Sequence, residues 1–203
     1  MFADFRLPTQ SDLEDVGIEF FKGCATAYAT SGDMYQIGAG FALRKLISCI
    51  EKEQIKKIDA WAKTQSWFPK DVAPVLIFTV QTAAAALLLK TAHYNRAQWS
   101  LITAANVALA ISTVAMSKIT PNAISRSMDT LQVSFSYGSI TGHLIGCDSV
   151  GTGVIFGLSA YFALNSQPDV KWHKKIQLEL LPYAGTAMCA KIIDTMWRQA
   201  MLR

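Results

Sequence analysis

The sequence predicts an all-α fold, a multi-pass membrane helical bundle with about four spanning helices and further amphipathic helices at the membrane surface. Its composition favours lipid over water, because 51% of the 203 residues are apolar and only 17% are charged. An ordinary soluble domain carries about 25% charged residues. Several stretches are almost free of charge over about 20 residues, the length that a spanning helix needs. We therefore expect one membrane domain over residues 1–203.

Residues 1–22 are expected to form a polar lead-in, rich in acidic side chains and without the features of a signal or transit peptide. Within it, Ser11 followed by Glu14 resembles a capping box and predicts the start of a short helix. Residues Gly23–Leu43 then carry a single charge, Asp33, and are long enough to cross a hydrocarbon core about 30 Å thick. Their many small side chains predict a span that other helices shield from lipid.

The middle of the chain contains one polar segment and two apolar ones. Residues Arg44–Lys70 show an interrupted amphipathic pattern, which predicts a helix that leaves the membrane and follows its surface. The charge-free segments Val72–Leu89 and Ala97–Ser117 follow, joined by a short polar turn, and predict a transmembrane hairpin. Tryptophans near the ends of such segments are expected to anchor the chain at the membrane interface. These are Trp61, Trp67, Trp99 and, farther along, Trp172.

A run of small residues between Gly138 and Tyr161 is the most regular feature of the sequence. On one helix these residues would lie within about 100° of arc, and they predict a seam where another helix of this chain or of another subunit packs closely. The stripe consists of Gly138, Gly142, Gly146, Ser149, Gly153, Gly157 and Ala160. Two interpretations stay open. Either the stretch is one continuous helix, or Asp148 caps a spanning helix Ser149–Asn165 and residues Thr130–Cys147 form an interfacial helix.

Residues 176–203 predict an amphipathic C-terminal helix that is broken or kinked at Pro182. Its larger apolar side chains are expected to dock this helix on the bundle or on a partner. They are Leu178, Leu181, Met188, Ile192, Met196 and Trp197.

Few residues suggest chemistry. The four cysteines and three histidines are scattered without metal-ligand spacing, so we expect no catalytic, metal or cofactor site, and lipid as the bound ligand. His143 alone among the histidines lies in an apolar stretch, and with Asp148 or Asp33 it could bind a cofactor or relay protons. The net charge of +4 is too small and too dispersed to favour nucleic acid as a partner.

The order of several short motifs resembles that of a known family. The motifs are Arg44-Lys45-Leu46, Trp67-Phe68-Pro69, an apolar hairpin with Asn106 in its second arm, Pro121-Asn122, and a helix near His143. They are similar to transmembrane-protein-205-like proteins and, more distantly, to the anthrone-oxygenase-like group. Lys70-Asp71 depart from the pattern, because the family usually has aromatic residues after the proline. The resemblance implies a four-helix membrane protein, and no catalytic residue is carried over from it.

These patterns predict a structural, non-catalytic supernumerary subunit of a larger membrane complex. A respiratory or ATP-synthase-type assembly in the mitochondrial inner membrane is the expected setting, with other membrane subunits and lipids as partners. The alternative is a small integral-membrane enzyme or transporter that uses His143, Asp148 or Asp33.

Overall fold

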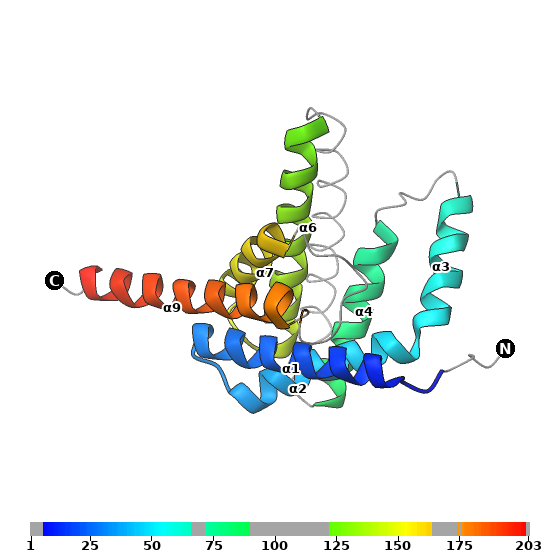
Figure 1. Ribbon diagram of the computed structural model, residues 1–203, viewed down its shortest axis with the longest axis horizontal. Helices are drawn as coiled ribbons and strands as arrows, with labels where there is room; N and C mark the ends of the chain where they lie inside the picture. Colours follow the sequence, from blue (N-terminus) through cyan, green and yellow to red (C-terminus); the bar gives the residue numbers. More distant parts are fainter. Residues whose placement is uncertain (1–5, 66–71, 90–121, 164–173, 175, 202–203) are drawn as a thin grey trace.

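The computed structural model describes residues 6–65, 72–89, 122–163, 174 and 176–201. Every regular element within these ranges is a helix, which confirms the predicted all-α class (Figure 1). The elements are α1 (Gln10–Thr30), α2 (Met34–Ile50), α3 (Lys52–Thr64), α4 (Val72–Leu88), α6 (Asn122–Ile145), α7 (Ser149–Ala163), the π-helical turn η1 (Ile176–Leu180) and α9 (Leu181–Met201).

Helix α1 begins earlier than predicted. The hydroxyl of Thr9 accepts the N–H of Asp12, and the Asp12 carboxylate accepts the N–H of Thr9, so these two residues form the capping box. The predicted pair, Ser11 and Glu14, is not the cap. Residues 1–22 are therefore more than a polar lead-in, because residues 10–22 are the first half of α1 and the side chains of Asp12 and Ile18 are buried.

Residues Gly23–Leu43 do not form a single spanning helix, contrary to the prediction. Ser31 adopts a left-handed conformation (φ 60°) that ends α1, and the Asp33 carboxylate accepts the N–H of Gln36 at 2.7 Å to begin α2. The chain reverses at this turn, so α1 and α2 pack closely along each other. At Gly23 the two backbones come so close that an added Cβ would lie 2.7 Å from the Cα of Gly38.

The glycine-rich stretch is also a hairpin of two helices. Helix α6 ends where the N–H groups of Gly146 and Cys147 both donate to the carbonyl of Gly142, at 3.0 and 2.8 Å, and Gly146 has a φ of +91°. Asp148 then begins α7 by accepting the N–H of Gly151 at 2.7 Å. The predicted break at Asp148 is confirmed, and the single continuous helix is wrong, because the left-handed glycine ends one helix and the Asp148 cap starts the next. The helix before the break begins at Asn122 instead of Thr130, and the spanning and interfacial positions assigned to the two helices stay predictions.

The remaining helices surround these two hairpins. Helix α4 packs against α2 and α6, with α3 beside it. Gln81 of α4 is 4% exposed and donates to Glu51, so this face of α4 contacts protein. Helix α9 lies along α1 and α7, and its C-terminal half extends beyond the other described elements (Figure 1). The main core lies where these elements meet, and its buried members are Ala27, Ala29, Ile37, Phe41, Ile145, Ile155, Tyr183 and Ala187.

In the part of the chain that the structure describes, no helix has both the length and the apolar character needed to cross a lipid bilayer. The predicted segment Val72–Leu89 is helical as α4. The second arm of the predicted hairpin, Ala97–Ser117, lies outside the described residues.

Candidate functional site

Four of the five predicted packing glycines lie where α6 and α7 face each other. A Cβ added at Gly138 would be 2.5 Å from the carbonyl oxygen of Thr152, and one at Gly142 would be 3.0 Å from the Cα of Ser149. From the other side, a Cβ at Gly153 would be 2.5 Å from the Oγ of Ser139. The stripe therefore does form a close helix seam, as its spacing predicts, and its partner is the other half of the same stripe.

Of the five predicted packing glycines, Gly146 is not part of the seam and Gly157 contributes little to it. Gly146 has no atom within 4 Å of an added Cβ and serves the turn through its positive φ, so its assignment as a packing residue is wrong. Gly157 would place a Cβ 3.4 Å from the nearest atom, an ordinary contact distance. The tight part of the seam is therefore confined to the half of each helix nearest the turn.

Each of the three residues of the predicted chemical alternative has a local contact of its own. Asp33 caps α2 and Asp148 caps α7, so each carboxylate is a local acceptor for backbone N–H groups. The Nδ1 of His143 lies 3.5 Å from the Oγ of Ser149, across the α6–α7 turn. No group of three or more His, Cys, Asp or Glu side chains with metal-binding geometry occurs in the described ranges.

Of the predicted interface anchors, the structure describes Trp61 alone. It lies on α3, with 52% of its surface exposed. Trp67, Trp99 and Trp172 lie outside the described residues.

The most concentrated group of charges is a part-buried ion cluster that ties three elements together. Glu19 of α1 accepts from Lys22 at 3.0 Å and from Arg44 of α2 at 2.8 Å. Lys22 also contacts Glu179 of η1 at 3.3 Å. The guanidinium of Arg44 lies over the ring of Phe78 in α4, 4.7 Å from its centroid. Arg44 as a whole is 9% exposed, and its Nε has no hydrogen-bond partner among the described residues.

The cluster keeps its members charged. Burial disfavours the ionised form of Glu19, but the nearby charges of Lys22 and Arg44 outweigh it and lower the pKa of Glu19 to about 2. Burial likewise opposes the charged form of Lys22, and Glu19 and Glu179 together raise its pKa above the ordinary value. Opposite charges in the low-dielectric interior thus stabilise one another, and the loss of one would leave its partner buried and uncompensated.

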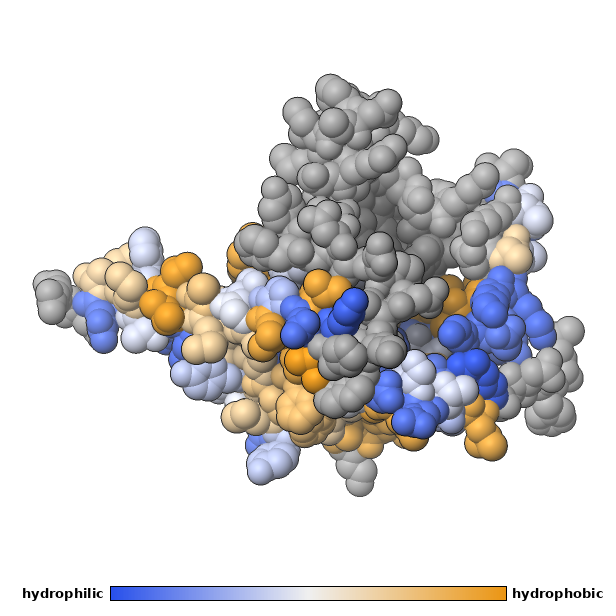
Figure 2. Space-filling view, viewed as in Figure 1, coloured by the Kyte–Doolittle hydropathy of each residue, from blue (hydrophilic) through white to orange (hydrophobic). Residues whose placement is uncertain are grey.

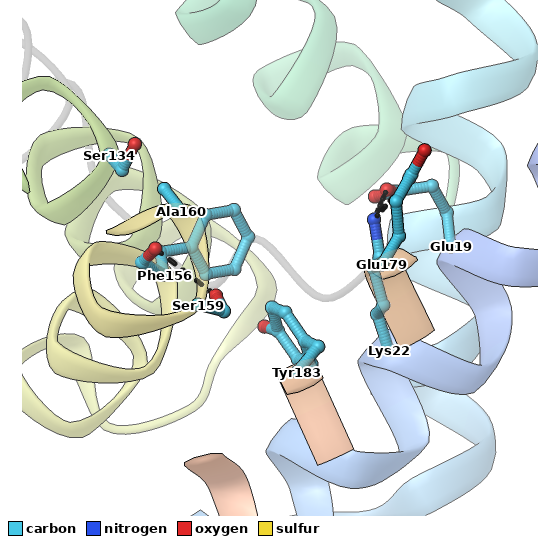
Figure 3. A pocket seen from close by; sticks show the side chains of 8 residues that line it. All are labelled: Glu19, Lys22, Ser134, Phe156, Ser159, Ala160, Glu179 and Tyr183. Carbon is cyan, nitrogen blue, oxygen red and sulfur yellow. Dashed lines mark hydrogen bonds and ion pairs between the residues drawn. The ribbon is translucent and has the colours of Figure 1, made fainter. Parts of the chain in front are cut away.

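A pocket of about 220 Å³ adjoins this cluster. Figure 3 shows Glu19, Lys22 and Glu179 on one side and Phe156 with Ser159 on the other. Tyr183 lies between the two sides, and its hydroxyl is 2.7 Å from the Oγ1 of Thr26.

The direction of that hydrogen bond follows from its neighbours. The Thr26 hydroxyl donates its one hydrogen to the carbonyl of Lys22, so the Tyr183 hydroxyl is the donor to Thr26. Burial raises the pKa of Tyr183 well above its usual range, so the hydroxyl keeps its proton.

Every charge lining the pocket already has a partner of opposite sign. We therefore infer that these residues hold η1 and α9 on the bundle.

The sequence analysis did not identify this cluster. Its only local signal is the spacing of Glu19 and Lys22, which are three residues apart and therefore neighbours on a helix. Arg44 is 25 residues from Glu19 and Glu179 is 157 residues from Lys22, so nothing local joins them.

One face of α9 is apolar and unpartnered among the described residues. We call it the α9 stripe, and it consists of Leu181, Gly185, Met188, Ile192 and Met196. Their spacing of three or four residues puts them on one side of the helix. The four large side chains are 56–64% exposed, whereas Tyr183, Thr186 and Ala187 on another side are buried. Figure 2 shows apolar side chains along α9 and over the lower part of the molecule, where α1 and α2 lie.

Comparison of the chain with protein-family models, with characterised proteins and with solved structures finds no significant match. The resemblance to transmembrane-protein-205-like proteins therefore stays a prediction from the short motifs.

Proposed function

We propose that this chain is a structural, non-catalytic subunit of a larger membrane complex, and that the α9 stripe is the face it presents to a neighbouring subunit. The observation that supports this is the exposure of the stripe. Its residues cover 16 positions of a helix, about 24 Å at 1.5 Å per residue, without a charge on that face. Contiguous exposed apolar surfaces are typical of protein or membrane contacts.

The way α9 is attached also supports the proposal. Tyr183 and Ala187 hold its first half in the core, and the ion pair between Lys22 and Glu179 fixes the preceding turn. The second half extends away from the bundle. An arm that is anchored at one end and apolar along an outer side can join two subunits. The predicted apolar segment Ala97–Ser117 is the part we expect within the bilayer.

The enzyme or transporter alternative has less support. Asp33 and Asp148 are engaged in starting helices, and His143 lies across a turn from Ser149. We therefore do not carry that alternative further.

The proposal is tested by adding one charge to the stripe. Ile192→Glu would put a carboxylate in the subunit contact without disturbing the core, because Ile192 is 56% exposed. We expect recovery of the tagged chain in its native complex, measured on a blue-native gel of mild-detergent extracts, to fall at least tenfold. Gln36→Glu adds the same charge at an exposed position on α2 and is expected to leave recovery unchanged. Equal recovery of the two variants would show that the stripe makes no subunit contact.

A further inference from the structure

We draw no further inference here: the strongest candidate, the pocket between the ion cluster of Glu19, Lys22 and Glu179 and the Phe156 side of α7, belongs to the site already described, because each charge that lines it is paired with another described residue.

Discussion

The Nζ of Lys22 and the Oε2 of Glu179 lie 3.3 Å apart, although 157 residues separate them in the chain. The same separation joins Thr26 to Tyr183, one helical turn farther along α1. Two polar contacts thus attach the start of the C-terminal arm to the first helix. Lys22 is shared with Glu19, and Glu19 with Arg44, so the attachment of the arm and the packing of α1 on α2 depend on the same charges.

Loss of Arg44 should destabilise the fold strongly. Arg44→Gln leaves Glu19 in a mostly buried position with one cation fewer, and breaking such a pair typically costs about 3–5 kcal/mol. The matched control is Lys56→Gln, because Lys56 pairs with Glu53 on an exposed face of α3. That pair should contribute at most about 0.5 kcal/mol. Thermal unfolding of the purified protein measures both, and similar losses would mean that the cluster is not a stabilising unit.

Stability should fall in acid because of Glu19. Its pKa is lowered from 4.5 to about 2 by folding, so the folded protein binds this proton less readily than the unfolded chain. The stabilisation, of roughly 3 kcal/mol, is complete above pH 4.5 and is lost as the pH falls toward 2. Denaturant unfolding measured across this window should show that decline. In Glu19→Gln the decline should be shallower, and an unchanged slope would assign the acid sensitivity to other carboxylates.

Loss of one hydroxyl should loosen α9 locally. Tyr183→Phe removes the hydrogen bond to Thr26 but keeps the ring against Phe156, whose centroid is 5.6 Å away. The expected cost is about 1 kcal/mol. Hydrogen exchange of the α9 amides should quicken about fivefold, with α6 and α7 unaffected. Tyr35→Phe, at a position 82% exposed, is the control and should change nothing. Exchange that quickens throughout the protein would point to a global effect instead.

The seam between α6 and α7 should reject even one methyl group. In Gly138→Ala the new Cβ would sit 2.5 Å from the Thr152 carbonyl oxygen and 2.8 Å from the Cα of Gly153, so the helices must move apart. We expect a loss of about 1–3 kcal/mol. Gly17→Ala, in the middle of α1 with nothing within 4 Å, should instead gain about 0.5–1 kcal/mol from the higher helix propensity of alanine. A neutral Gly138→Ala would mean that the seam is looser than described.

The sequence was sufficient for the helical class and for the close packing of its glycines. The sequence did not identify the helix that packs against these glycines. A stripe of period 3.6 has the same spacing in one long helix and in two helices that fold back on each other. The turn signals were present, with Gly146 and Asp148 in one hairpin and Ser31-Gly32-Asp33 in the other. Interpreting residues 23–43 as a span gave the length of a nearly charge-free stretch more weight than these turn residues, and the structure follows the turn residues.

The C-terminal helix illustrates a second limit. Near Pro182, where a break or kink is predicted, the helix changes type without an interruption, because the π-helical turn ends at Leu180 and regular helix begins at Leu181. The side chains that were expected to dock the C-terminal helix are exposed, and Tyr183 and Ala187 pack it against the core instead. An amphipathic pattern marks an apolar face but does not say whether the chain itself covers that face. The ion cluster could not be found at all, since its charges meet only after the chain has folded.

The glycine seam is formed by two helices that follow each other in the sequence, and this affects the order in which the chain folds. Helices α6 and α7 are joined by three residues, so they can pair as soon as both have been synthesised, with little loop entropy to overcome. Helix α9 contacts α1 across most of the chain and is made last. We expect pulse-labelled hydrogen exchange during refolding to protect the amides of α6 and α7 before those of α9. Until the arm docks, Lys22 lacks Glu179 and the surface that Tyr183 will cover is open, so a nascent chain is most vulnerable to aggregation in its final step.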